Sequence, residues 1–225
     1  MSARPPRPPP GLTALLAGAT GLVGGELLRR LLTSPRYARI VVLTRRPLPG
    51  AASAKLHSVV TDFEHLGSVR EELAADHAFC ALGTTIAKAG SRAAFRKVDH
   101  EYVLRVAQLA RMQGARHFSV VSALGAGAGS PLFYSRVKGE VELALRQMGW
   151  PSLAILRPSV IAGQRAESRP LERLGEGLLA HGPSAWRPVQ AHDIAAAMLA
   201  LALREPAGAT VVKSQEITPL AAATV

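Results

Sequence analysis

Gly18-Ala19-Thr20-Gly21-Leu22-Val23-Gly24 is the most informative stretch of this 225-residue chain. An apolar run at 12–17 precedes it, and leucines at helical spacing follow it over 24–32, so a strand, a glycine turn and a helix are predicted in that order. Glycines there permit a tight turn, let the backbone approach a pyrophosphate and let the helix pack against its strand. Free N–H groups at the helix start then favour phosphate. The stretch therefore predicts a dinucleotide-binding loop, with expected contacts at Gly18, Thr20, Gly21, Leu22, Val23 and Gly24.

Strand-like and helix-like segments alternate along the rest of the chain, which is typical of a parallel sheet covered by helices. Strands are predicted at 12–17, 40–44, 57–61, 78–82, 117–122, 153–157 and 210–213, and helices at 24–32, 93–113, 133–148 and 193–203. The predicted fold is α/β: a Rossmann-type, doubly wound, mostly parallel sheet with helices on both faces.

Length favours a single domain over 12–225, preceded by a disordered, proline-rich tail at 1–11. Several Gly and Pro residues at 164–188 predict a short cap over the substrate. No apolar run reaches the ~20 residues of a spanning helix. The N-terminus lacks the apolar region of a secretory signal. The single cysteine, Cys80, fits a buried position in a reducing compartment. We therefore expect a cytoplasmic protein without membrane association. No residues have metal-ligand spacing, so no metal is expected.

The net charge of +11 favours anionic partners. The 27 basic residues are scattered, however, and aromatic residues make up only 4% of the chain, which leaves little for base stacking. We therefore expect a phosphorylated cofactor and a solvated basic surface, and no binding of nucleic acid.

The end of the second predicted strand indicates which cofactor is bound. About twenty residues past the glycine loop, an acidic residue would favour NAD, whereas arginine accommodates the 2′-phosphate of NADP. The sequence there is Thr44-Arg45-Arg46-Pro47, without a carboxylate. Guanidinium groups bind phosphate through a planar fork of donors. Thr44, Arg45 and Arg46 therefore predict NADPH, although paired arginines also occur on ordinary surfaces.

Three further residues form a candidate catalytic set. Tyr134 and Lys138 are four residues apart on a predicted helix and hence on one face. Ser122 ends the fifth predicted strand, at the carboxyl edge of the sheet where ligands bind. A nearby ammonium favours the phenolate form of a tyrosine, and a serine hydroxyl can orient a substrate oxygen. The set predicts proton transfer by Tyr134, with Ser122 and Lys138 in support.

With these motifs the chain resembles the short-chain dehydrogenase/reductase superfamily, in its extended or atypical branch. It is more closely similar to the oxidoreductase family that includes the Tat-interacting protein and small bacterial homologues. The matching stretches are 18–24, 82–85, 88–91, 98–99, 121–125, 134–140, 157–158 and 167–170, so the resemblance covers nearly all of the chain after residue 12.

The resemblance implies further cofactor contacts. Asp62 and Phe63 match the place where the superfamily touches the adenine, although Asp62 also suits a helix N-cap. Leu82, Gly83 and Thr84 match the loop that lines the adenine ribose and pyrophosphate. Pro158, Ser159 and Val160 match the turn that meets the nicotinamide carboxamide, and Lys138 would also bind the nicotinamide ribose.

Three functions follow as hypotheses. The first is an NADPH-dependent reductase that transfers hydride to a small carbonyl substrate. The second is an NADPH-binding regulator with a protein partner and little turnover. The third is an NAD-dependent sugar epimerase or dehydratase, which normally has an acidic residue near position 45. The chain is expected to be a monomer or a homodimer, with helices 93–113 and 133–148 as the possible dimer face.

Overall fold

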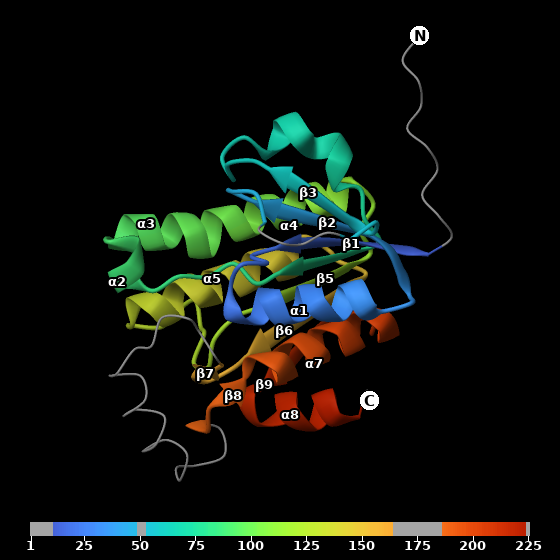
Figure 1. Cartoon of the computed structure of the whole chain (residues 1–225). Helices are drawn as coiled ribbons and strands as arrows, with labels where there is room; N and C mark the ends of the chain where they lie inside the picture. The colour runs from blue at the N-terminus through green and yellow to red at the C-terminus, as the bar shows by residue number, and fades with distance from the viewer. Residues whose placement is uncertain (1–10, 49–52, 164–185, 224–225) are drawn as a thin grey trace.

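The central sheet has seven parallel strands over the described residues, which are 11–48, 53–163 and 186–223 of the computed structural model (Figure 1). In spatial order the strands are β3 (Leu56–Val60), β2 (Tyr37–Thr44), β1 (Leu12–Ala17), β4 (His77–Cys80), β5 (His117–Val121), β6 (Ser152–Arg157) and β9 (Gly208–Lys213). The strand order reverses between β1 and β4, and such a switch point opens a crevice at the carboxyl edge. The predicted Rossmann-type sheet is confirmed.

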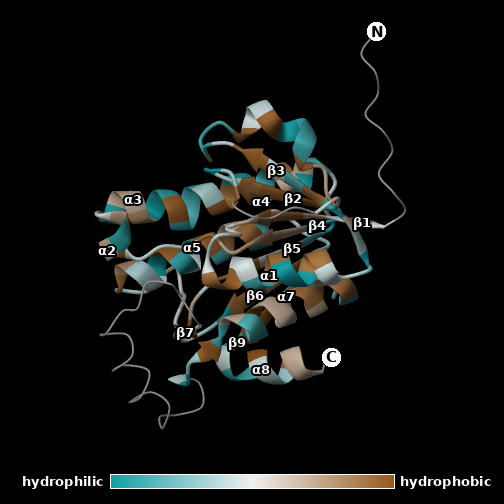
Figure 2. Ribbon diagram, viewed as in Figure 1, coloured by the Kyte–Doolittle hydropathy of each residue, from teal (hydrophilic) through white to brown (hydrophobic). Residues whose placement is uncertain are grey.

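Helices cover both faces of this sheet. On one face lie α1 (Leu22–Thr33), α7 (Ala191–Arg204) and α8 (Ser214–Ala222), and on the other lie η1 (Leu66–Leu73), α4 (Val103–Met112) and α5 (Phe133–Gln147). Alternation along β1 supplies both cores, because Ala14 and Leu16 pack on the first face while Leu15 and Ala17 pack on the second. Burial on both faces explains the apolar strands, which are brown in Figure 2.

The single helix predicted at 93–113 is interrupted in the structure. After the short α2 (Ile86–Ala89), the chain forms α3 (Arg92–Arg96), a π-helical turn η2 (Lys97–Tyr102) and then α4. A π turn inserts an extra residue into a helix and often marks a functional position. Apolar residues at helical spacing lie on both sides of the turn, so periodicity alone does not reveal it. Asp99, inside the turn, is buried.

Five elements lie outside the sequence predictions, and the short helices η1 and α2 are two of them. The strands β7 (Ile161–Ala162) and β8 (Val189–Gln190) form a separate parallel pair, and they are too short for a periodic pattern. The helix α8 contains Pro219, which lowers helix propensity. Residues 1–10 of the expected tail and 164–185 of the expected cap lie outside the described residues. Among the described helices, none is long and apolar enough to cross a membrane.

Candidate functional site

The glycine loop lies between β1 and α1, as its sequence predicts. Gly18 has φ +93°, and a Cβ there would lie 2.6 Å from the backbone of Ala81, so a larger residue cannot be placed without a shift. A Cβ on Gly24 would lie 2.0 Å from the Gly18 carbonyl oxygen, which is why the start of α1 can pack directly on the loop. No side chain of the described residues caps this helix, so its first N–H groups and partial positive charge face the crevice.

Two adjoining cavities follow the carboxyl edge of the sheet. The first has a volume of about 720 Å³ and extends from Arg45 past the glycine loop. The second has a volume of about 430 Å³ and contains the Tyr134 and Lys138 side chains. Both are lined by Gly21, Lys88 and the run from Ala81 to Thr84. The shared residues make the two cavities one continuous groove.

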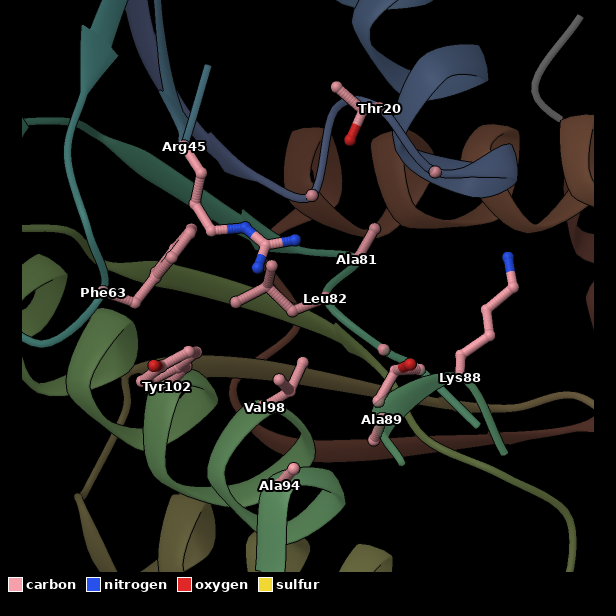
Figure 3. Close-up of a pocket in the computed structure, with 14 residues that line it drawn as sticks. Thr20, Arg45, Phe63, Ala81, Leu82, Lys88, Ala89, Ala94, Val98 and Tyr102 are labelled. Atoms are coloured by element: carbon pink, nitrogen blue, oxygen red, sulfur yellow. The ribbon is translucent and has the colours of Figure 1, made fainter. Parts of the chain in front are cut away.

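The first cavity combines an aromatic wall with positive charge. Phe63 and Tyr102 stack with ring centroids 5.4 Å apart and form one wall, a surface on which a base could stack. Arg45 and Lys88 enter from opposite sides, and the Arg45 guanidinium lies above Leu82 (Figure 3). None of the described residues that line this cavity is acidic. An anionic ligand is therefore favoured there.

Most of the predicted cofactor contacts line the groove. They are Gly18, Thr20, Gly21, Leu22, Val23, Arg45, Phe63, Leu82, Gly83, Thr84, Tyr134, Lys138, Pro158, Ser159 and Val160.

Four predicted contacts have other roles. Gly24 supports the loop from behind, and the Thr44 hydroxyl donates to the Arg46 carbonyl oxygen at 2.7 Å. Arg46 itself does not line either cavity. The Asp62 carboxylate accepts N–H groups of Glu64 and His65 in the turn before η1. It is not the helix N-cap that its sequence also suggested, because that position is His65. The interactions of Asp62 with His65 hold the pKa of its carboxyl below the usual range.

Tyr134 lies at the start of α5 and lines the second cavity. The residue is 39% exposed. The loop before α5 fixes this position, since the Gly127 N–H donates to the Ser135 carbonyl at 3.1 Å. A Cβ on Gly139 would lie 2.1 Å from the Gly127 backbone, so glycine at 139 allows the loop to lie on the helix. The Tyr134 ring also contacts Phe95, with centroids 5.5 Å apart.

Ser122 reaches the second cavity, but its hydroxyl has another partner. Its Oγ donates to the buried carboxylate of Glu142, which also accepts Nε of Arg157 at 2.9 Å. The expected hydrogen bond from Ser122 to a substrate oxygen would compete with this contact. The sequence predictions do not include Glu142 and Arg157 as site residues. The available signal is that Glu142 is a charged residue on the buried face of its helix, where it needs a partner.

Lys138 is buried beside an acidic residue that the sequence predictions did not include. Its Nζ lies 2.8 Å from Oδ1 of Asp99, and the exposed fractions of the two side chains are 7% and 1%. Asp99 follows Phe95 by four residues and thus falls on the apolar face of the predicted helix. A carboxylate there needs a partner, which is the signal that could have revealed it. Asp99 and Lys88 each belong to a matching stretch, at 98–99 and 88–91, without a predicted role.

Comparison with known proteins agrees with this geometry. Residues 18–205 match the family described as NAD(P)H-binding. Protein HTATIP2 of Rattus norvegicus is 35% identical over 177 residues, which are 77% of this chain and 73% of that protein. A protein of Emericella nidulans, named as mitochondrial fmp52, is 40% identical over 163 residues, 70% of either chain.

Solved structures share the fold at lower identity. MoeE5 in complex with UDP-glucose and NAD has a TM-score of 0.66 and 18% identity, and the match covers 94% of this chain and 81% of that one. The UDP-Glc/GlcNAc 4-epimerase of Campylobacter jejuni also has a TM-score of 0.66 and 18% identity, covering 93% and 82%. The glycine loop, the sheet order and these matches together show that the chain belongs to the NAD(P)H-binding family of Rossmann-fold proteins, with HTATIP2 and fmp52 proteins among its relatives.

Proposed function

We propose that this protein is an NADPH-dependent oxidoreductase of the short-chain dehydrogenase/reductase type, acting on a small carbonyl substrate. The observation that carries the proposal is the continuous groove, which has a phosphate loop and an arginine in one cavity and the Tyr134–Lys138 pair in the other. In this proposal a dinucleotide lies along the groove, with its adenine end near Phe63 and its nicotinamide near Tyr134.

The preference for NADPH over NADH rests on Arg45. Its guanidinium lies in the cavity, with five N–H donors that suit the 2′-phosphate, and no carboxylate among the described lining residues would repel that group. Arg46 is the next residue but lies outside the cavity, so Arg45 is the proposed contact. Lys88 adds a second cation on the other side, facing the region where a pyrophosphate would meet the glycine loop.

In the proposed reaction, NADPH held by the glycine loop and Arg45 would supply a hydride to the carbonyl carbon of the substrate. Tyr134 donates its hydroxyl proton to the carbonyl oxygen, which yields an alcohol. Lys138 places a positive charge near the phenolate that remains. Ser122 would donate a hydrogen bond to the substrate oxygen only when its donation to Glu142 is released.

A second candidate function is NADPH binding with little turnover, as in a regulator that passes its cofactor state to a protein partner. The contact between Ser122 and Glu142 favours this alternative, because it occupies the hydroxyl that a substrate would need. The epimerase or dehydratase alternative is supported only by the fold that this chain shares with solved epimerase structures. Arg45 argues against it, because an NAD-dependent enzyme would have an acidic residue at this position.

The test compares NADPH and NADH affinity in the wild type, Arg45→Ala and Arg46→Ala. We expect Arg45→Ala to weaken NADPH binding by roughly 10- to 100-fold, as for loss of charged hydrogen bonds, and to leave NADH binding nearly unchanged. Arg46→Ala is the matched control and should resemble the wild type. Equal affinity of the wild type for the two cofactors would contradict the NADPH preference.

Turnover is tested in the same series with a panel of aldehydes and ketones. NADPH oxidation by the wild type and its loss in Tyr134→Phe would support the reductase. If NADPH binds tightly but neither protein oxidises it with any substrate, the binding-only alternative is favoured.

A further inference from the structure

Asp99 occupies the point where the groove, the π turn and α5 meet. It is 1% exposed, although a carboxylate is costly to bury without partners. The π turn η2 carries it, between two regular helical segments. Asp99 is the one buried residue of η2, since the other five residues of the turn are partly buried or exposed.

The two oxygens of Asp99 contact two parts of the proposed site. Oδ2 accepts the backbone N–H of Thr84 at 2.8 Å, and Thr84 belongs to the loop that both cavities share. Oδ1 lies 2.8 Å from Nζ of Lys138 on α5. One carboxylate therefore connects the loop predicted to line the cofactor with the lysine predicted to assist Tyr134.

The charge of Lys138 depends on this contact. Three titratable groups face its ammonium: Asp99 from η2, Tyr134 from α5 itself and Cys80 from the end of β4. Burial raises the pKa of the Cys80 thiol to about 12, so this group is neutral near pH 7. Burial alone would lower the pKa of Lys138, but the charge and hydrogen bond of Asp99, together with the negative forms of Tyr134 and Cys80, raise that pKa above the ordinary value.

We propose that Asp99 is a positioning residue of this site: its carboxylate keeps Lys138 charged and fixes the ammonium against the loop at residues 82–85. The role in a reaction rests on the proposed function, whereas the effect on Lys138 does not. Asp99 acts through Lys138 and the Thr84 N–H, and it is assigned no contact with substrate.

Asp99→Asn separates the two contacts. The amide oxygen can still accept the Thr84 N–H, but the negative charge beside Lys138 is removed. If only the hydrogen bond to the loop matters, this variant should behave like the wild type. If the charge matters, Lys138 becomes a buried cation without a counter-ion and should lose its proton at lower pH.

The measurement is a pH titration of the lysine side chains by NMR, with carbon-13 at Cε. The chain has only five lysines, at 55, 88, 97, 138 and 213, and the Lys138 signal is assigned by its loss in Lys138→Arg. In the wild type, the Lys138 signal should not titrate below pH 10.5. In Asp99→Asn, its midpoint should fall by at least about 2 pH units, as for other buried lysines.

Glu64→Gln is the matched control, because Glu64 forms an exposed ion pair at 2.7 Å with Lys97, which lies on η2 together with Asp99. It should leave the Lys138 titration unchanged. A Lys138 midpoint in Asp99→Asn equal to that of the wild type would overturn the proposal. A wild-type Lys138 that titrates below pH 10.5 would also overturn the proposal, and this measurement requires no variant.

If Asp99→Asn does not fold, Asp99→Asn/Lys138→Met removes both charges. If the double variant folds, the unpaired charge of Lys138 explains why Asp99→Asn does not, which supports the proposal. If neither variant folds, the unpaired charge is not the reason, which contradicts the proposal. The titration uses neither NADPH nor substrate. Its outcome is therefore distinguishable from a failure of the proposed function, which the cofactor titration and the turnover assay test.

With an active substrate, the pH dependence of kcat gives a second measurement. Loss of the Lys138 proton in Asp99→Asn should move the alkaline limb of the profile to lower pH, in step with the NMR midpoint. A uniform fall in kcat without a shift of the limb would indicate a structural role only and would contradict the proposal.

Discussion

Gly24 and Gly25 are neighbours in the first turn of α1, but only one of them lies against another part of the chain. A Cβ on Gly24 would meet the Gly18 carbonyl oxygen at 2.0 Å, whereas a Cβ on Gly25 would have its nearest neighbour, Ala19 O, at 3.5 Å. The first distance is impossible without movement of the phosphate loop, and the second is ordinary contact. At the scale of the residue, therefore, the third glycine of the motif serves packing of the loop rather than contact with a ligand.

This difference predicts opposite results for two adjacent substitutions. Gly24→Ala should displace the loop, weaken NADPH binding at least roughly 10-fold and destabilise the protein by about 1–3 kcal/mol, as for overpacking. Gly25→Ala should leave binding unchanged and stabilise the helix by about 0.5–1 kcal/mol. Cofactor titration and urea unfolding measure the two effects. Similar behaviour of both variants would show that the close contact at Gly24 is not what requires glycine.

At the scale of elements, Glu142 connects three pieces of structure through one carboxylate. It extends from α5, accepts the Ser122 hydroxyl at the end of β5 and pairs with Arg157 at the end of β6. The Glu142 side chain is 3% exposed, whereas Arg157 is partly open to solvent. The contact therefore fixes how α5, and with it Tyr134 and Lys138, lies over the edge of the sheet.

Glu142→Gln should lower the free energy of unfolding by about 1–3 kcal/mol, because a buried charged hydrogen bond is weakened and Arg157 loses its counter-ion. Glu140→Gln is the control on the same helix, since its pair with Arg96 is partly exposed and should contribute less than about 1 kcal/mol. Urea unfolding of both variants measures the difference. Equal losses would mean that burial of the Glu142 contact adds nothing to stability.

At the scale of elements, local patterns in the chain predict the strands and the groove but not the π turn or the buried ion pairs. Continuous apolar runs predict the strands because both faces of a parallel sheet are buried, and the glycine loop predicts the position of the groove. Periodicity does not predict the π turn, since the residues on either side keep helical spacing. The partners of Ser122 and Lys138 depend on Glu142 and Asp99, which pack against them across the fold. Such pairs lie 20 and 39 residues apart in the chain, so local patterns do not contain them.

At the scale of the whole molecule, the edge of the sheet opposite the groove contains a buried polar network. His77 Nδ1 contacts the Tyr37 hydroxyl at 2.7 Å, and its Nε2 contacts Glu205 at 2.8 Å. His117 lies beside it and is hydrogen-bonded by both ring nitrogens, to Ser152 at 2.8 Å and to Ser119 at 2.6 Å. The amino ends of β2, β4, β5 and β6 thus meet in one network.

Both histidines are expected to destabilise the fold in acid. Burial lowers the pKa of His77, although Glu205 opposes this, and burial lowers the pKa of His117 from 6.5 to about 3. Between these two values the unfolded chain binds a proton at His117 that the folded chain does not. The free energy of unfolding should therefore be constant above about pH 7 and fall below pH 6.5, by up to about 1.4 kcal/mol per pH unit for His117.

Urea unfolding at pH 7.5, 6.5, 5.5 and 5.0 measures this slope, in a range where most carboxylates stay ionised. His117→Gln should be less stable at pH 7.5, because it disturbs two buried hydrogen bonds, and should show a smaller slope below pH 6.5. His57→Gln is the control, since the His57 side chain is 44% exposed and should leave the slope unchanged. A wild-type stability that is constant from pH 7.5 to 5.0 would contradict burial of a neutral His117. If the slope persists in His117→Gln, it arises at His77 or at another group.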